Sequence, residues 1–186
     1  AGFTGTLRLR LLNNSAGTEK SVSVGKDWVD VSVDYPSVPF IDTPYVQGNP
    51  KIEFKYPPDA KRLPVIRWGE RSDSFFASWD EQAAEFALLE SRKMRILSPA
   101  GDKENVRQTG VDTLMLHYDA VVELYESLCG VSFEPEHPTD ANVRNRFFMK
   151  ADEQGAGGAY YGGAWFANSE PRLYTWVTNL RTDWGS

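Results

Sequence analysis

The sequence predicts an α+β fold, in which a small antiparallel β unit precedes a second part organised around one long helix. Polar and apolar residues alternate over several short runs in the first third of the chain, as they do in half-buried strands. Residues 112–129 instead space their apolar side chains at helical intervals. With 186 residues, 41% of them hydrophobic and 25% charged, the chain has the composition of a folded globular protein.

The β unit is predicted over residues 1–56 and is expected to be an incomplete, sandwich-like domain. Its predicted strands are residues 6–11, 21–24, 28–33 and 51–56. Gly25-Lys26-Asp27 separates the second run from the third and predicts a hairpin there. Pro57-Pro58-Asp59 follows, where the pattern changes, and it marks the predicted boundary with a second domain over residues 57–186.

The second part is predicted to combine short strands with helices. Strands are expected over residues 64–68 and 146–149, and a hairpin over residues 86–89 and 94–97. Ser72 or Asp73 would cap a helix that runs to Ala83. Residues 100–110 are expected to be a polar loop.

The long helix is the clearest element. One apolar stripe is predicted along it, formed by Leu114, Tyr118, Val121, Val122, Tyr125 and Leu128. Gly130 is a natural stop for such a helix. The chain's single cysteine, Cys129, excludes an internal disulfide and is expected to be a buried structural thiol.

Charge and hydropathy exclude two classes of partner. The net charge of −6 and the absence of a basic stripe argue against nucleic-acid binding. Acidic residues flank the short basic clusters at 92–95 and 144–150, and we interpret these clusters as solvated faces. No run of about eighteen apolar residues is present, so no transmembrane segment is predicted.

Few residues suggest catalysis within this chain. The two histidines, His117 and His137, lack the paired spacing of a zinc site, and we expect surface or locally hydrogen-bonded side chains. Two acidic pairs, Asp80-Glu81 and Glu134/Glu136, are compatible with glycosidase carboxylates, although such pairs are common.

The most unusual local feature is a glycine- and aromatic-rich segment. Its residues Gly157, Gly158, Ala159, Tyr160, Tyr161, Gly162, Gly163 and Trp165 combine close backbone approach with flat contact faces. The segment fits an edge strand that pairs with an extended peptide, and it equally fits a loop that covers the core.

This segment also carries a resemblance to a known family. Residues 150–162, KADEQGAGGAYYG, are similar to a stretch found in baculoviral and bacterial enhancins. Further similar segments lie at residues 1–14, 37–42 and 118–130, in the family's order. Several separate matches in order are more specific than any single motif.

The resemblance implies the upstream half of a gluzincin-like zinc metallopeptidase domain, with a mixed sheet packed on the long helix. The parent enzyme would be a hydrolase, a secreted or virion-associated extracellular endopeptidase that degrades mucin-like glycoproteins as a virulence factor. In the family, an HExxH helix holds the zinc and the general base. That helix would begin beyond Ser186, so no catalytic or metal-binding residue is assigned to this chain.

The resemblance gives the glycine- and aromatic-rich segment a role as the substrate-binding strand. The chain's partners would then be the glycoprotein substrate and the remainder of the same polypeptide. Two alternatives stay open for residues 1–56, namely a β module that binds glycan or mucin and a purely structural brace for the catalytic domain.

Overall fold

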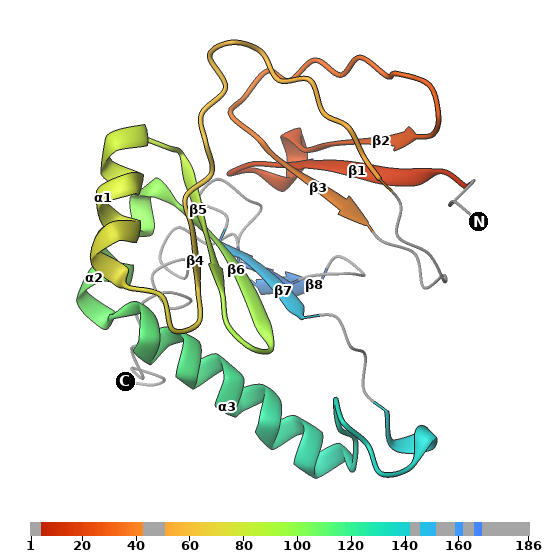
Figure 1. The fold of residues 1–186 in the computed structure, drawn as a ribbon, viewed down its shortest axis with the longest axis vertical. Coiled ribbons are helices and arrows are strands. Elements are labelled where there is room, and N and C mark those ends of the chain that lie inside the picture. The colour runs from red at the N-terminus through yellow and green to blue at the C-terminus, as the bar shows by residue number, and fades with distance from the viewer. Residues whose placement is uncertain (1–4, 43–50, 142–145, 152–158, 162–165, 169–186) are drawn as a thin grey trace.

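The computed structural model describes residues 5–42, 51–141, 146–151, 159–161 and 166–168. These residues form three layers (Figure 1), with a small antiparallel sheet on one side, a larger mixed sheet in the middle and helices on the far face of the mixed sheet. The α+β prediction is therefore confirmed, including the mixed sheet and the long helix.

The small sheet, called sheet A, has the order β2-β1-β3. β1 (Leu7–Leu12) lies at its centre and pairs antiparallel with β2 (Lys20–Val24) and β3 (Val38–Asp42). A short 3-10 turn, η1 (Ala16–Thr18), joins β1 to β2. Leu7, Leu9 and Leu11 are buried and alternate with the more exposed Arg8 and Arg10, as expected for a strand. Leu12, on the same side of the strand as the arginines, is buried as well.

Two predicted strands of the amino-terminal unit are wrong. Residues 28–33 and 51–56 are extended but join no sheet, and the predicted hairpin at residues 25–27 is absent. The run at residues 28–33 contacts β2 through a side chain, since the Nζ of Lys20 donates to the carbonyl of Ser32 at 2.8 Å. The ammonium of Lys55 lies 4.5 Å from the centre of the Trp28 ring.

The mixed sheet, called sheet B, has the order β4-β5-β6-β7-β9-β8. Its strands are β4 (Val65–Arg67), β5 (Phe86–Glu90), β6 (Met94–Pro99), β7 (Phe147–Ala151), β8 (Ala159–Tyr161) and β9 (Phe166–Asn168). β5 and β6 form the predicted antiparallel hairpin, whereas β4 pairs parallel to β5 and β7 parallel to both β6 and β9.

Helices cover one face of sheet B. α1 (Ser72–Gln82) begins after Arg71 rather than at a side-chain cap, so neither Ser72 nor Asp73 is its N-cap. Residues 100–110 are not a polar loop but hold a 3-10 turn, η2 (Ala100–Asp102), and α2 (Lys103–Thr109). A single fully buried side chain, Val106, anchors α2 in the core. One apolar position in seven residues is too weak a pattern to predict a helix.

α3 (Val111–Cys129) is the predicted long helix, and it ends at Gly130, whose φ of 67° is a left-handed conformation that favours glycine. The predicted stripe along it is only partly buried. Leu114 and Val122 lie in the core, whereas Tyr125 and Leu128 are exposed. Cys129 is also exposed, because the last turn of α3 extends past the sheet, so the expected buried thiol is wrong.

β5 and β6 of sheet B are buried on both faces, and their side chains alternate between two clusters. Ala87 and Leu89 of β5, with Ile96 of β6, face the helices. Trp79 of α1 is fully buried there, and its indole N–H donates to the carbonyl of Ala84 at 2.9 Å. Truncation of such a side chain to alanine typically costs about 3–5 kcal/mol.

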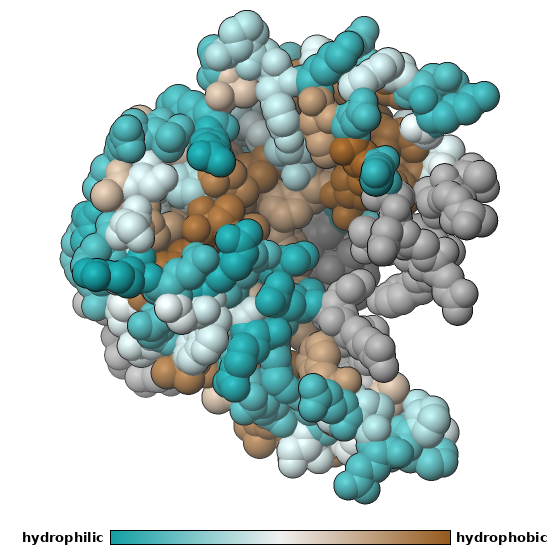
Figure 2. Space-filling view, in the orientation of Figure 1, coloured by the Kyte–Doolittle hydropathy of each residue, from teal (hydrophilic) through white to brown (hydrophobic). Residues whose placement is uncertain are grey.

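The opposite face of sheet B packs on sheet A. Phe86, Leu88 and Leu97 of sheet B form one cluster with Leu12 and Val38 of sheet A. Apolar surface is visible in the region between the two sheets (Figure 2). The two sheets thus share a core, and the division of the chain into domains 1–56 and 57–186 stays a prediction.

Candidate functional site at the edge of the mixed sheet

Among the described residues, sheet B ends in two outermost strands, β4 at one edge and β8 at the other. β8 pairs antiparallel with β9, with Ala159 opposite Asn168, Tyr160 opposite Ala167 and Tyr161 opposite Phe166. β9 is its only partner strand in this part of the chain. A strand with one paired side presents the alternate N–H and C=O groups of its other side to a further extended chain.

The three central residues of the glycine- and aromatic-rich segment, Ala159, Tyr160 and Tyr161, therefore form an edge strand. Gly157, Gly158, Gly162, Gly163 and Trp165 lie outside the described residues. The choice between edge strand and covering loop is settled in favour of a strand for residues 159–161. The substrate-binding role of the segment stays a prediction.

A buried ion pair lies in β7, two strands in from this edge. Lys150 lies in β7, in register with Ala167 of β9, which is itself in register with Tyr160 of β8. Lys150 is fully buried, and its Nζ donates to the carbonyl of Asn13 at 2.9 Å and to the Glu19 carboxylate. Burial of an ammonium group is costly unless a carboxylate and further acceptors surround it, and these two partners come from sheet A.

The loop that receives Lys150 is itself organised by hydrogen bonds. The side-chain Oδ1 of Asn13 accepts from the backbone N–H of Ser15 at 2.8 Å and from the Thr18 hydroxyl at 3.1 Å. Asn13 is buried, and these bonds satisfy its oxygen. The prediction that Lys150 belongs to a solvated basic face is therefore wrong, because its partners lie more than 130 positions earlier in the chain.

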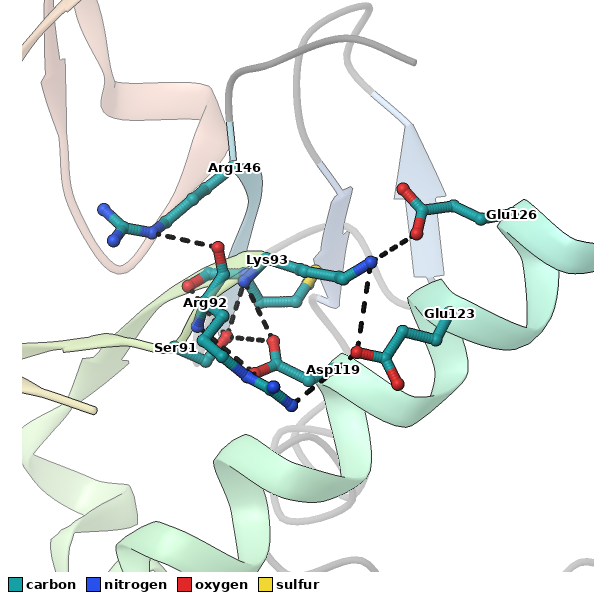
Figure 3. A network of polar contacts seen from close by, with 8 residues as sticks. Ser91, Arg92, Lys93, Asp119, Glu123, Glu126 and Arg146 are labelled. Carbon is teal, nitrogen blue, oxygen red and sulfur yellow. Dashed lines mark hydrogen bonds and ion pairs between the residues drawn. The ribbon is translucent and has the colours of Figure 1, made fainter. Parts of the chain in front are cut away.

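A second polar cluster joins the turn of the β5–β6 hairpin to α3 (Figure 3). Asp119 of α3 is fully buried and points at that turn. It accepts from the Ser91 hydroxyl at 2.6 Å, from the Lys93 backbone N–H at 2.9 Å and from the backbone and side chain of Arg92, each at 3.2 Å. With four donors, the carboxylate is fully satisfied, which suits a positioning role rather than proton transfer.

Neighbouring charges extend this cluster toward β7. Lys93 pairs with Glu126, and Arg92 lies 3.6 Å from Glu123. The Nε of Arg146, just before β7, donates to the carbonyl of Arg92 at 3.4 Å. The cluster thus links α3, the hairpin and the start of β7. The sequence did hold a signal for Asp119, because it follows Met115 by four positions and precedes Val122 by three, on the buried side of α3.

The candidate acid–base and metal residues are not gathered into a site. Asp80 of the Asp80-Glu81 pair accepts from Lys103 at 2.6 Å and from Arg107 at 3.1 Å, and the Lys103 hydrogen bond lowers the pKa of this carboxyl. A carboxylate held ionised in this way is unsuited to act as a general acid. Glu134 and Glu136 lie exposed in the loop after α3.

The histidines have local partners. Nδ1 of His137 lies 2.7 Å from the Thr139 hydroxyl, and the ring of His117 packs edge-on against Tyr118. Across the described residues, no group of three or more His, Cys, Asp or Glu side chains is arranged to hold a metal ion. The donor set present there does not fit zinc. Among the helices that the structure describes, none combines the length and the apolar character that a membrane span requires.

Comparison with known proteins gives a sequence relationship and a fold relationship. No family model matches the chain. The viral-enhancing factor of Pseudalatia unipuncta granulosis virus is 32% identical over 99% of the chain, and that of Trichoplusia ni granulosis virus is 31% identical over 99%. In both cases the chain spans only 21% of the relative's length.

Solved structures share the fold at low sequence identity. The M60 catalytic domain of Clostridium perfringens ZmpC, solved in complex with the sialyl T antigen, superimposes with a TM-score of 0.59 and 15% identity, covering 97% of this chain and 40% of that one. The C. perfringens ZmpB metallopeptidase gives a TM-score of 0.60 and 11% identity, covering 99% and 43%. These likenesses establish the fold of the chain.

Proposed function

The chain is an enhancin-like sequence with the fold of M60 metallopeptidases, and from this premise we propose that it is the upstream part of a zinc metalloendopeptidase that degrades mucin-like glycoproteins. Its own contribution is a wall of the substrate cleft. The zinc ion and the general base belong to an HExxH helix in the polypeptide that follows Ser186. The chain alone is inactive in this proposal.

Among the described residues, β8 has one side that pairs with no strand, and this observation carries the proposal. A peptide substrate in extended conformation adds to this edge as a further strand, and main-chain hydrogen bonds fix its position relative to the reacting carbonyl. The glycines on either side of Ala159–Tyr161 allow the substrate backbone to approach closely. Binding through the main chain tolerates varied side chains, as a protease for heavily glycosylated protein requires.

The choice of substrate rests on two supports. The viral-enhancing factors are about 30% identical over nearly the whole of this chain, and one protein of the same fold was solved in complex with the sialyl T antigen. A glycoprotein substrate places the enzyme outside the cell, secreted or associated with a virion. The acidic net charge of −6 suits a substrate that is not nucleic acid.

A proline scan of β8 in the longer natural protein tests the edge. Successive residues of an antiparallel strand direct their N–H groups alternately to the partner strand and away from it. Ala159→Pro, Tyr160→Pro and Tyr161→Pro should therefore fall into two classes. The class that faces outward loses about tenfold in kcat/KM because one substrate hydrogen bond is removed, while the melting temperature is unchanged.

The proline variants whose N–H faces β9 serve as the internal control. Each of them removes a backbone hydrogen bond to β9 and should therefore lower the melting temperature. Tyr160→Ala separates loss of the side chain from loss of the N–H. If all three prolines leave peptidase activity on a mucin substrate unaltered, the edge does not bind substrate and this part of the proposal is wrong.

For residues 1–56, we propose that the sheet braces the catalytic fold. The shared cluster of Leu12 and Val38 with Phe86, Leu88 and Leu97 supports this role, as does the pair of Lys150 with Glu19. Both sets of contacts join sheet A to sheet B near the strands that lead to the edge. The brace and the proposed division at residue 57 are compatible, because packed domains can share an interface.

A further inference from the structure

Three arginines converge on one carboxylate at the end of sheet B where β5 turns into β6. The Nε of Arg95 donates to the Glu90 carboxylate at 2.7 Å. The Nε of Arg67 and the Nη1 of Arg146 lie 3.1 Å and 4.0 Å from the same carboxylate. We call Arg67, Arg95 and Arg146 the arginine row. Two of its members come from the basic clusters of the sequence, which are about fifty positions apart.

The strand register places the row on the face of sheet B that packs on sheet A. Glu90 lies opposite Arg67 on one side and opposite Arg95 on the other. Because side chains alternate along a strand, Glu90 and Arg95 share a face with Leu88 and Leu97, which belong to the core between the sheets.

This end of the face is open among the described residues. The side chains of the arginine row are 38–61% exposed, although the leucines on the same face are buried. Figure 2 shows hydrophilic surface over β4 and the β5–β6 hairpin, below the apolar surface between the two sheets. Figure 3 shows Arg146 pointing away from α3. The row is therefore accessible to a ligand from solvent.

The contacts with Glu90 leave many of the guanidinium donors unused. Arg67 and Arg95 reach the carboxylate through Nε, which carries one of the five N–H groups of a guanidinium. Within the described part of the chain, the terminal amino groups of Arg95 form no hydrogen bond. The Nη1 of Arg67 lies 3.9 Å from Glu70, which is beyond hydrogen-bonding distance. Glu90 thus fixes the arginines in place while terminal N–H groups remain available to a further acceptor.

The row holds an excess of positive charge in an acidic chain. Its three guanidiniums face two carboxylates, Glu90 and Glu70, so one positive charge is left over. Arg92 and Lys93 in the adjoining turn are paired with carboxylates of α3 and do not add to this excess. A single excess charge with unused N–H groups suits one carboxylate or sulfate ester. A polyanion would be repelled by the net charge of −6 on the rest of the molecule.

We propose that the arginine row is a subsite that binds the acidic group, a carboxylate or a sulfate ester, of one sugar on the glycoprotein substrate. The glycan as source of the anion rests on the proposed function, whereas the site itself rests on the contacts around Glu90. Parallel N–H bonds from a planar guanidinium fix the orientation of such a group. Because β9 lies between β7 and the β8 edge, the row contacts a part of the substrate other than the peptide on that edge.

Titration of the 186-residue chain with single sugars tests the subsite without peptidase activity. The acidic probes are the methyl glycoside of N-acetylneuraminic acid, which carries a carboxylate, and a sulfated galactose. Galactose is the neutral probe, and inorganic sulfate is the free anion. We expect saturable changes in the NMR signals of the arginine Nε–H groups with both acidic sugars and none with galactose.

Substitutions within the row should weaken the binding of the acidic sugars. Arg95→Gln and Arg67→Gln should each lower the affinity about fivefold or more, because each removes one guanidinium. Arg95→Lys keeps the charge but not the planar fork and should recover only part of the affinity. Arg71→Gln is the matched control, since this arginine is 86% exposed, pairs with Asp73 outside the row and should not affect binding.

The melting temperature of each variant checks that it folds, and the two positions in the row decide the result independently. The proposal is overturned if the acidic sugars do not bind, or if both glutamine variants bind them as the natural chain does. An equal loss of affinity in Arg71→Gln also overturns it. Affinity for inorganic sulfate, or for an acidic peptide, that matches or exceeds the affinity for the acidic sugars overturns the assignment to a glycan.

Peptidase assays on the longer natural protein separate this inference from the proposed function. The preference in kcat/KM for mucin with acidic sugars over mucin stripped of them should fall severalfold in Arg95→Gln and persist in Arg71→Gln. A longer protein that cleaves both mucins equally well, while the row binds no acidic sugar, refutes this inference alone. A row that binds acidic sugars in a longer protein without peptidase activity refutes only the function.

Discussion

At the scale of single residues, the fold depends on a few buried charged groups whose partners are distant in the sequence. Asp119 and Ser91 are 28 positions apart, and Lys150 and Glu19 are 131 apart. Pattern analysis treats a charged residue as exposed unless its partner is adjacent. These roles could not be predicted from the sequence, because the free energy of burying a charge depends on tertiary neighbours that composition and spacing do not reveal.

Replacement of Asp119 by alanine should destabilise the chain more than replacement of any neighbouring carboxylate. The change removes the acceptor of the Lys93 backbone N–H and the nearer of the two acceptors of the Ser91 hydroxyl, whose other acceptor is the Met94 carbonyl. We expect a loss of about 3 kcal/mol in the free energy of unfolding, measured by urea denaturation. Glu123→Ala is the matched control on the same helix, 49% exposed, and should cost less than about 1 kcal/mol. If Asp119→Ala and Glu123→Ala lower the free energy of unfolding equally, the buried contacts of Asp119 do not stabilise the fold more than an exposed carboxylate does.

The Lys150–Glu19 pair predicts a double-mutant pattern. Lys150→Met alone leaves the Glu19 carboxylate, only 10% exposed, without its cation and should cost about 3–5 kcal/mol. Lys150→Met combined with Glu19→Gln should recover most of that loss, because no unpaired charge is left in the interface. Denaturant unfolding of the two single variants and the double variant checks this. Additive losses would contradict a coupled buried pair.

Tyr118 predicts how stability depends on alkaline pH. Burial raises the pKa of its phenol above the ordinary value of 10.0, so the folded protein holds the proton more tightly than the unfolded chain does. The stability from this group is fully present below pH 10.0 and is lost as the pH rises through the folded pKa. Tyr118→Phe should therefore lose less stability than the natural chain between pH 9 and pH 11. Parallel pH profiles for the two proteins would contradict this.

At the scale of elements, periodicity predicted the strands and helices that bury one clear face. β1, β2, β4, the β5–β6 hairpin, α3 and β7 follow patterns visible in the sequence. Residues 28–33 show the same alternation but form no strand, because alternation gives no information about whether a partner strand is available. α3 shows a related ambiguity, since Leu114 and Val122 of the predicted stripe are buried whereas Tyr125 and Leu128 are exposed where the helix extends past the sheet.

The composition of the sequence indicated the segment of the candidate site, and the structure shows where part of that segment lies in sheet B. Glycines and aromatic residues around Tyr160 indicated a special backbone, and the sheet order places residues 159–161 at an edge. The edge position follows from β9 lying between β7 and β8, although β9 comes last in the chain. Such a crossover depends on long-range pairing and cannot be read from local pattern.

At the scale of the whole molecule, three layers connect the amino-terminal sheet to the edge strand. Sheet A packs on one face of sheet B, the helices pack on the other, and both cores meet in the strands that lead to β8. The arrangement supports a division of labour in which this chain provides a rigid wall and the following polypeptide provides the metal chemistry. Cleft walls built on sheets hold a substrate more precisely than loops do.

Zinc content measured in parallel on the 186-residue chain and on the natural polypeptide extended past Ser186 tests this division most directly. The account predicts stoichiometric zinc, together with peptidase activity on mucin, only for the extended protein. Stoichiometric zinc on the 186-residue chain, or an extended protein that binds none, would contradict it.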